Sequence, residues 1–315
     1  MQVEFLCYPN LDAADLTTPK VLAAGFFDGV HLGHKNVIQT AIRLARSKNQ
    51  VAAVLTFDRH PATVFGQYPP DKIFQYLTPL ARKLEIFEQL GVDIVYIAEF
   101  NDQFMKLPPK KFINDFLIKL GLTTLVAGYD WTFGPKAVAT MDYLRQLAQG
   151  RFQICQVPEL IYEKNKVSST NIRNYLKEGE ITAANLMLSY NYRNQGVVVH
   201  GAKMGRQLGY PTANLAVGAD QLLPRIGVYV TRVLVAGKWY PAMTSIGRNI
   251  TFKRGDNPLT VEANLLNFER DLYGQELTIE WLYYLRDEIK FADATGLMDQ
   301  LAVDQQSTEK YFGKK

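Results

Sequence analysis

His31 and His34 stand three residues apart in the stretch GFFDGVHLGHKN, residues 25–36. An apolar run precedes this stretch and a helical pattern follows, so both rings are expected on one side of a helix's first turn. The free backbone N–H groups of such a turn attract anions, and two imidazoles add donors for phosphate oxygens. Gly33 lets the backbone approach a ligand closely. The stretch predicts a nucleotide triphosphate site from which pyrophosphate leaves.

A second stretch, VSSTNIR (residues 167–173), places three hydroxyl-bearing residues before another predicted helix. Ser169 and Arg173 are four residues apart and therefore share one helix face. Hydroxyls, free N–H groups and a guanidinium at a helix start suit the β- and γ-phosphates of a nucleotide. Two simpler interpretations stay open: a glycine-rich turn with exposed histidines, and an ordinary helix cap beside a solvated arginine.

A third group of candidates lies in GAKMGRQLGYPTANL, residues 201–215. The stretch is not a Walker A loop, because it lacks the GK[ST] ending. Thr212 and Asn214 alternate in an extended segment, so their oxygens point the same way and suit Mg²⁺. The stretch also supplies glycines, at which the backbone can approach a ligand closely, and cations that can bind phosphates. These residues are Gly201, Gly205, Gly209, Lys203 and Arg206.

Glu262 lies in the otherwise apolar run TVEANLL, where Val261 and Ala263 are expected to face the opposite way. A carboxylate in such a strand either reaches solvent or has a functional role. The role that suits glutamate is that of a general base, which accepts a proton.

The elements that must position these residues form two groups. In the first half of the chain, β-branched apolar runs alternate with helical patterns, which predicts parallel βαβ units in an α/β Rossmann-like domain. The expected strands are 21–27, 51–57, 93–100, 124–130 and 152–157. The expected helices are 34–48, 78–91, 108–121 and 139–150. The second helix has Leu80, Leu84, Phe87 and Leu90 on one face, and two helices end on a glycine that suits a C-cap.

From about residue 190 short strands follow one another, which predicts an antiparallel barrel or sandwich. The expected strands are 195–201, 227–235, 238–247, 259–268 and 277–287, with a hairpin turn at AGK (236–238) and a closing helix within 293–312. We expect an α/β Rossmann-like domain over residues 1–184, followed by a small antiparallel β-barrel domain with a C-terminal helix over residues 185–315.

Composition limits the classes of function. The 315 residues are 47% hydrophobic and carry a net charge of +4, so the chain can bury large cores and suits a phosphate-bearing small substrate. The basic residues are not clustered as in nucleic-acid-binding proteins. Cys7 and Cys155 lie far apart, and no run of about 18 apolar residues occurs. We therefore expect a cytoplasmic protein with no nucleic-acid or membrane partner. Weak self-association is left open.

Several stretches together resemble the bacterial bifunctional riboflavin kinases/FAD synthetases. GFFDGVHLGHKN, TFDRHP (56–61), GYDWTFG (128–134) and SSTNIR are similar to the FMN adenylyltransferase module of that family. HGAKMGRQLGYPTANL, GVYV (227–230) and VEANLLNFERDLYG (261–274) are similar to its riboflavin kinase module. The resemblance implies ATP-dependent phosphorylation of riboflavin to FMN, and then transfer of an adenylyl group from ATP to FMN, giving FAD and pyrophosphate.

The resemblance also implies residue roles. In the adenylyltransferase, the residues expected at ATP are Gly25, Phe27, Asp28, His31, Gly33, His34, Asp130, Ser169, Thr170 and Arg173, and those expected near FMN are Asp58, His60 and Pro61. In the kinase, the residues expected at ATP are Gly201, Lys203, Gly205, Arg206, Gly209, Thr212 and Asn214, the last two also holding Mg²⁺. Glu262 is the expected base for the riboflavin hydroxyl, with Tyr273 and Gly274 beside the flavin.

Two other functions stay open at this point. One is a nucleotidyltransferase that acts on another phosphate, such as a nicotinamide or pantetheine nucleotide, with a passive barrel. The other is a flavin-sensing protein without turnover. The intact PTAN segment and Glu262 argue against the first, and the presence of the expected catalytic residues argues against the second.

Overall fold

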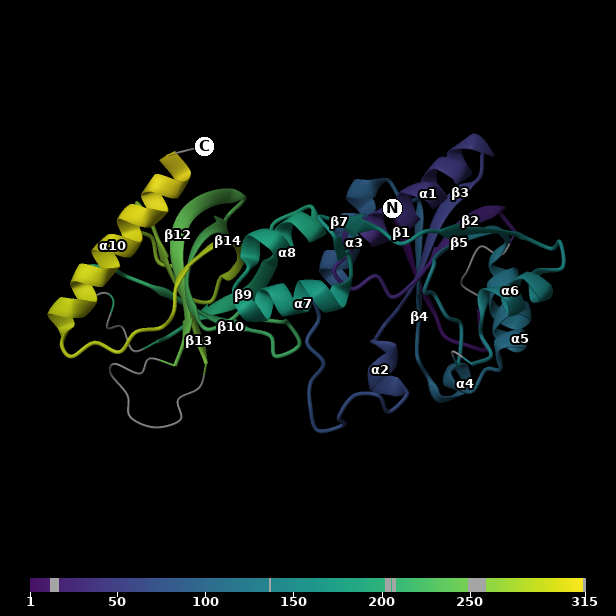
Figure 1. The fold of residues 1–315 in the computed structure, drawn as a ribbon, viewed down its shortest axis with the longest axis horizontal. Helices are drawn as coiled ribbons and strands as arrows, with labels where there is room; N and C mark the ends of the chain where they lie inside the picture. Colours follow the sequence, from purple (N-terminus) through teal and green to yellow (C-terminus); the bar gives the residue numbers. More distant parts are fainter. Residues whose placement is uncertain (12–16, 136, 202–204, 206–207, 249–258, 314–315) are drawn as a thin grey trace. The chain divides into compact units, whose positions relative to one another are not determined.

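The computed structural model describes residues 1–11, 17–135, 137–201, 205, 208–248 and 259–313. The chain divides between Ser169 and Thr170 into two compact units, each with its own sheet (Figure 1). Within the described part, no helix combines the length and the apolar character needed to cross a membrane. The α/β domain followed by a small antiparallel barrel, expected from the sequence, is confirmed.

The first unit is built on a six-stranded parallel sheet with the order β1-β4-β3-β2-β5-β6. Its strands are β1 (Gln2–Leu6), β2 (Lys20–Ala24), β3 (Val51–Phe57), β4 (Ile94–Ala98), β5 (Leu122–Gly128) and β6 (Gln153–Val157). Five of them match the predicted strands. The edge strand β1 was not predicted, because it alternates exposed and buried residues and lacks the continuous apolar run of a central parallel strand.

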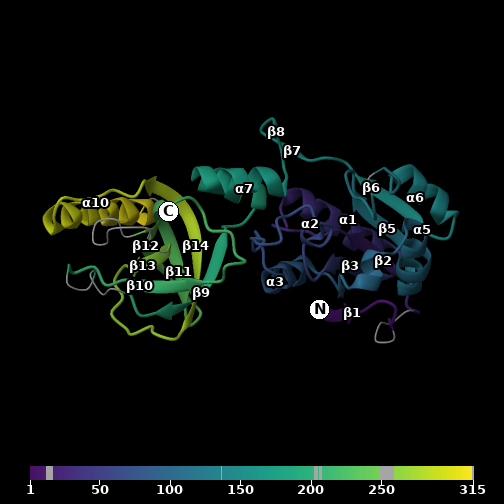
Figure 2. The ribbon, with the colours of Figure 1, turned by 90° about the horizontal axis from the view of Figure 1, so that it is seen from below.

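Helices cover both faces of this sheet. α1 (Leu32–Ser47) packs on β2, β3 and β5, and it also contacts α3 (Leu80–Leu90). The opposite face buries an aromatic-rich core with the helical segments that follow β4 and β5. These segments are α4 (Asp102–Met105), α5 (Pro109–Lys111), η1 (Phe112–Leu117), η2 (Ile118–Leu120) and α6 (Met141–Ala148). Figure 2 shows α5 and α6 on one side of the sheet and α1 and α3 on the other.

The buried face of α3 differs from the predicted one. Of the expected stripe, only Phe87 is buried, whereas Leu80, Leu84 and Leu90 are half-buried. Lys83 and Ile86 are buried in their place, because the Lys83 ammonium turns inward to the carbonyl of Phe26. The helix ends as predicted, with Gly91 in the left-handed conformation at φ 88°.

The strand order identifies the edge of the sheet at which a ligand is expected to bind. After β2 the chain moves outward through β3 and β4, and it returns to the other side of β2 with β5. The carboxyl ends of β2 and β5 therefore form the switch point at which open α/β sheets bind ligands. The histidine stretch follows β2, TFDRHP includes the end of β3, and GYDWTFG begins at the end of β5.

The second unit contains a closed antiparallel barrel with the order β10-β13-β12-β11-β14-β9. Its strands are β9 (Arg193–Val199), β10 (Ala213–Val217), β11 (Gly227–Val235), β12 (Lys238–Gly247), β13 (Thr260–Leu265) and β14 (Glu276–Arg286). Ala236 and Gly237 have φ of 47° and 80° in the tight turn of the β11–β12 hairpin, as predicted for AGK. The long helix α10 (Ala294–Gly313) packs on β12 and is prominent in Figure 1.

Two helices, α7 (Ser169–Glu178) and α8 (Ile181–Leu188), connect to the barrel strands. Leu176 accepts a hydrogen bond at its carbonyl from the Arg225 N–H at 2.9 Å. The Asn185 side chain donates to the Trp281 carbonyl and accepts from the Tyr192 N–H. The barrel is thus bonded to both helices, and the division at Ser169/Thr170 keeps all of these bonds in one unit.

We expect a fragment of residues 170–315 to be more stable than one of residues 185–315. The shorter fragment removes the Leu176–Arg225 bond and the buried side chains of Ile181 and Ala184. Its melting temperature should be lower by about 5 °C or more, measured by circular dichroism. A fragment starting at residue 160, which adds only residues outside the compact unit, is the control. Equal melting temperatures for the fragments 170–315 and 185–315 would mean that α7 and α8 do not stabilise the barrel.

Candidate active sites

The histidine turn is an unusual piece of backbone. Phe27, Gly29 and Val30 all have positive φ, at 58°, 86° and 33°. Such values are costly for phenylalanine and valine and persist only where the surroundings hold them. The turn ends at His31, which caps the N-terminus of α1, so the helix begins two residues earlier than the predicted start at His34.

The two imidazole rings lie face to face. Their centroids are 3.6 Å apart with planes 18° from parallel, which confirms that both side chains lie on one side of the helix start. His31 Nδ1 accepts a hydrogen bond from the His34 N–H at 3.3 Å. In the neutral ring the hydrogen therefore sits on Nε2, which is left as a donor.

Burial keeps both histidines neutral. Desolvation, together with the nearby positive charge of Lys166, lowers the pKa of His31 to about 4, while a backbone hydrogen bond opposes the shift. Desolvation also holds the pKa of His34 well below its ordinary value, and the charges of His31 and Lys83 act in the same direction. His34 Nδ1 is buried and has no hydrogen-bond partner in the described residues. The structure thus places two neutral imidazoles at a helix N-terminus, where backbone N–H groups favour negative charge.

Asp28 holds the turn in place. Its buried carboxylate accepts the N–H groups of Leu77 and Thr78, both at 3.0 Å, just before α3. The Thr78 hydroxyl in turn accepts the Gly29 N–H at 2.7 Å. The Asp28 carboxylate therefore stabilises the turn through these hydrogen bonds. Asp28 was expected at ATP, and its side-chain contacts support a structural role in holding the turn.

Three other predicted residues form the wall behind the histidines. The Phe27 ring is buried and lies edge-on to His34, with centroids 5.3 Å apart. A Cβ on Gly25 would lie 2.8 Å from the Phe27 ring, so only glycine lets this ring fold back. A Cβ on Gly33 would come within 3.2 Å of the His31 ring. These residues shape the site by permitting close packing.

Asp58, His60 and Pro61 follow β3 at the same edge of the sheet. The Asp58 carboxylate accepts the Phe100 N–H at 3.0 Å and pairs with Arg59. His60 caps α2 (Pro61–Val64), with Nδ1 accepting the Ala62 N–H, and its ring stacks on Phe74 at 4.3 Å. Pro61 occupies the first position of α2.

Asp130 lies after β5 in an exposed cluster of charges. Its carboxylate is 3.7 Å from the Lys166 ammonium, which also pairs with Glu159 at 3.2 Å and hydrogen-bonds the Tyr129 hydroxyl. Lys166 carries positive charge close enough to His31 to lower its pKa. This cation was not predicted, because it belongs to the short hairpin of β7 (Ile161–Tyr162) and β8 (Asn165–Lys166) rather than to a motif.

Ser169 joins the turn directly. Its hydroxyl donates to the Asp28 carbonyl at 2.8 Å. The three hydroxyl-bearing residues were expected before the helix. α7 begins at Ser169, so of the three only Ser168 precedes the helix, and Ser169 and Thr170 lie in its first turn. Thr170 and Arg173 belong to the second compact unit, with Arg173 half-buried on α7.

In the barrel, Thr212, Asn214 and Glu262 converge. The Thr212 hydroxyl donates to Glu262 Oε2 at 3.2 Å, and Asn214 on β10 is paired with Glu262 on β13. Val261 and Ala263 are buried on the opposite side, as predicted. Because the hydroxyl hydrogen of Thr212 points to Glu262, its oxygen lone pairs are left for another partner.

The three glycines of the stretch 201–215 occupy positions that favour glycine for different structural reasons. A Cβ on Gly201 would lie 2.4 Å from the Asn214 amide, so glycine lets this side chain come close to the backbone. A Cβ on Gly205 would lie 2.3 Å from the Tyr210 carbonyl oxygen. Gly209 has φ of 81° and open space around it. Lys203 and Arg206 lie outside the described residues.

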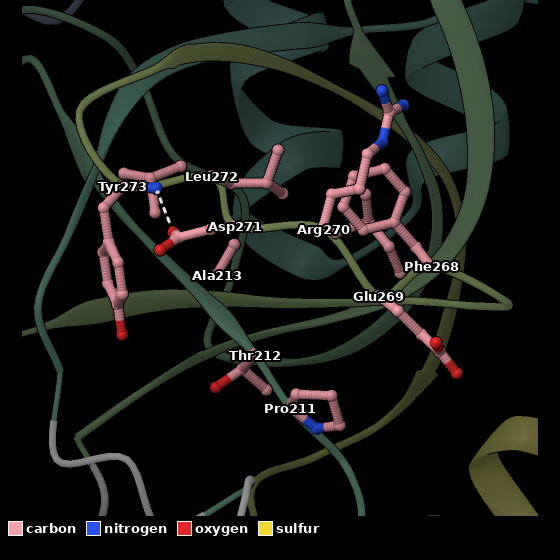
Figure 3. A pocket seen from close by; sticks show the side chains of 11 residues that line it. Pro211, Thr212, Ala213, Phe268, Glu269, Arg270, Asp271, Leu272 and Tyr273 are labelled. Carbon is pink, nitrogen blue, oxygen red and sulfur yellow. Dashed lines mark hydrogen bonds between the residues drawn. The ribbon is translucent and has the colours of Figure 1, made fainter.

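A pocket of about 430 Å³ opens beside Thr212 (Figure 3). This volume falls in the range of small-molecule sites. One side is made by the segment Phe268–Tyr273, whose Asp271 carboxylate accepts the Tyr273 N–H at 2.9 Å. The Tyr273 ring contacts the ring of His200 with centroids 4.0 Å apart, and Gly274 continues the turn with φ of 74°.

Phe268, Arg270 and Asp271 also line this pocket and were not among the predicted site residues. The available signal was their place in NFERDLYG, between Glu262 and Tyr273.

The fold and geometry define a protein with two candidate sites. In the α/β unit a histidine pair lies at the switch point of the sheet, and in the closed barrel Thr212 and the Glu262 carboxylate lie beside a pocket. A family model described as FAD synthetase matches residues 14–171, and one described as riboflavin kinase matches residues 188–312.

Relatives match nearly the whole chain. The bifunctional riboflavin kinase/FMN adenylyltransferase of Listeria monocytogenes is 44% identical, covering 94% of this chain and 93% of its own length. That of Bacillus subtilis is 36% identical, covering 99% and 98%. A crystal structure from Streptococcus pneumoniae, described as a macrolide-efflux protein, is 32% identical with a TM-score of 0.88, covering 97% and 98% of the two chains.

The chain belongs to the family of bifunctional riboflavin kinases/FMN adenylyltransferases. It is a transferase with both activities, and the resemblance of its motifs to this family is confirmed.

The neutral histidines predict an acid-sensitive first unit. Because their pKa values are lower in the folded than in the unfolded chain, their contribution to stability is present above about pH 6.5. It is lost as the pH falls toward about 4, where His31 becomes protonated. Urea unfolding of the full chain at pH 4.5 to 7.5, followed by circular dichroism, should show a free energy of unfolding that falls with acid.

A double variant, His31→Asn with His34→Gln, should reduce this dependence by up to about 1.4 kcal/mol per pH unit for each histidine. Asparagine at position 31 keeps a helix cap, so the helix start is preserved. An unchanged slope would mean that the imidazoles are not buried in neutral form.

Proposed function

We propose that His31 and His34 hold the triphosphate of ATP during adenylyl transfer. The observation that supports this is the stack of two neutral imidazoles at the N-terminus of α1, fixed by the Asp28 contacts. An oxygen of the FMN phosphate forms a bond to the α-phosphorus of ATP, and the bond from that phosphorus to the pyrophosphate oxygen breaks. The imidazole N–H donors and the helix N–H groups stabilise the charge that moves onto the leaving pyrophosphate. No protein nucleophile is needed.

The surrounding residues have supporting roles in this proposal. Ser169, Thr170 and Arg173, at the start of α7, approach the β- and γ-phosphates, and the bond from Ser169 to the Asp28 carbonyl supports this role by tying Ser169 to the histidine turn. Asp130 lies near the ribose, on the loop after β5. Asp58, His60 and Pro61 border the FMN side, where the His60–Phe74 stack provides a flat apolar surface.

In the barrel, we propose that Glu262 accepts the proton of the riboflavin 5′-hydroxyl. The hydroxyl oxygen then bonds to the γ-phosphorus of a second ATP, and ADP leaves. Support comes from the contact of Glu262 with Thr212, which itself lines the pocket for the flavin. Tyr273 lines that pocket and Gly274 follows it in the chain. We propose that Gly201, Gly205 and Gly209, with Lys203 and Arg206 of the same stretch, bind the phosphates.

The same oxygens fit a magnesium ion. Hard oxygen ligands are what Mg²⁺ prefers, and Thr212 and Asn214 supply a hydroxyl and an amide oxygen beside the Glu262 carboxylate. Among the described residues, no group of three or more His, Cys, Asp or Glu side chains is arranged to hold a metal ion, so further ligands would come from ATP and water. When bound, Mg²⁺ would neutralise charge on the transferred phosphate.

We further propose that the protein works in the cytoplasm on small molecules, without nucleic acid or membrane, and with weak self-association left open. Its two cysteines, Cys7 and Cys155, are both free, which agrees with a reducing compartment.

Replacing the histidine pair should separate the two activities. In the chain with His31→Asn and His34→Gln, FAD formation from supplied FMN should fall by about 10²-fold or more, because each donor contributes roughly that factor. FMN formation from riboflavin should stay near the parental rate. Both products are followed by chromatography. Equal loss of both activities would contradict the assignment of the pair to one site.

Glu262→Gln should produce the reverse pattern. Riboflavin phosphorylation should fall by about 10²- to 10⁴-fold, since glutamine keeps the shape but cannot accept the proton. Conversion of supplied FMN to FAD should continue. Glu276→Gln, at an exposed position at the start of β14, is the matched control. Kinase turnover within a few-fold of the parent would show that Glu262 is not the base.

A further inference from the structure

Lys83 is a buried lysine beneath the histidine turn. Its exposed fraction is 2%, although lysine is almost never buried without a partner. The ammonium nitrogen donates to the Phe26 carbonyl at 3.2 Å and lies 4.0 Å from the centroid of the Phe26 ring. Among the described residues, no carboxylate lies within ion-pair distance of this ammonium.

Several charged or titratable groups face Lys83 from the elements around it. Asp28 follows β2 and Asp58 follows β3, and both favour the charged ammonium from a distance. His34, on α1, is close enough for the positive charge of Lys83 to lower its pKa. Asp28 and Asp58 already accept backbone N–H groups at Thr78 and Phe100. Neither carboxylate forms an ion pair with Lys83, so each attracts the ammonium only from a longer distance.

Phe26 connects this charge to the site. Its carbonyl also accepts the Thr56 hydroxyl at 3.0 Å, at the end of β3. Its ring meets His60 edge-on, with centroids 4.8 Å apart. Lys83 and Phe26 therefore lie between the histidine turn and the segment that follows β3, at the carboxyl edge of the sheet.

A buried charge without an ion pair is unfavourable unless another charge compensates it. Both substrates of adenylyl transfer carry phosphate groups, and the histidine turn lies beside Lys83. We propose that the Lys83 ammonium is a positioning residue that draws the phosphate groups of the substrates to the histidine turn by its positive charge. This inference rests on the proposed role of the histidine turn in adenylyl transfer.

The proposal implies a pH dependence of a definite sign. Burial lowers the pKa of Lys83 to about 8, against the attraction of Asp28 and Asp58. Near pH 7 the group is mostly charged, and above about pH 8 the charge is lost. The kcat/KM for FAD formation should therefore fall above about pH 8, whereas riboflavin phosphorylation by the same chain should not share this limb.

Two variants separate charge from hydrogen bonding. Lys83→Arg keeps a positive charge that does not titrate below pH 12. Lys83→Gln keeps an N–H donor for the Phe26 carbonyl but removes the charge. Lys48→Gln is the matched control, since Lys48 bonds Thr124 and Gln153 elsewhere in the first unit. Each full-length variant is assayed with supplied FMN and ATP from pH 6.5 to 10.

Lys83→Gln should lower kcat/KM by roughly 10- to 100-fold at pH 7, comparable to losing an interaction with a charged group. Lys83→Arg should retain activity and shift the alkaline limb upward. Binding of inorganic pyrophosphate, measured by calorimetry, should weaken between pH 7 and 9.5 in the parent but not in Lys83→Arg.

Parental activity in Lys83→Gln would overturn the proposal, since a hydrogen bond would then suffice. An alkaline limb that stays at the same pH in Lys83→Arg would also overturn it. For a variant whose turnover is too low to measure, the pH dependence of pyrophosphate binding decides the question instead. If the variant with both histidines replaced keeps making FAD, the proposed function fails instead, and the two failures are thereby distinguished.

Discussion

The buried carboxylate of Asp28 is the interaction on which the first site depends. It holds a turn in which Phe27, Gly29 and Val30 have positive φ against the segment before α3, through Leu77 and Thr78. These bonds help to offset the backbone strain at Phe27 and Val30. With it, His31 caps α1, His34 stacks on His31, and Ser169 reaches the Asp28 carbonyl. One residue thus connects the end of β2 with α1, α3 and Ser169.

The second site is assembled in a different way. In the barrel, strand pairing alone brings Asn214 opposite Glu262, and the adjacent Thr212 completes the group. The ladder of β10 and β13 fixes which faces meet, because a shift by one residue would turn Glu262 to the other side. Gly201 then lets Asn214 pack against the backbone. A loop held by hydrogen bonds forms one site, and a strand register forms the other.

Much of this architecture could be predicted from the sequence. The central parallel strands are continuous apolar runs, and the hairpin at Ala236 and Gly237 has a characteristic turn. The histidine turn and Glu262 were found because their residue types are unusual where they occur. The sequence could not predict the contacts of Asp28, Lys83 and Lys166. Each of these contacts depends on a partner that is brought close only by tertiary folding. The inward turn of Lys83 also explains why the predicted apolar face of α3 was displaced.

The connectivity of the strands also determines the order in which the chain can fold as it is synthesised. All pairings of the parallel sheet lie within Met1–Ser169, so that sheet can close while later residues are still being added. The barrel cannot, since β9 pairs with β14, with Gly196 opposite Leu277. β9 must remain unpaired along that edge until β14 has been synthesised. The strand pairings of the parallel sheet can therefore all form before those of the barrel are complete.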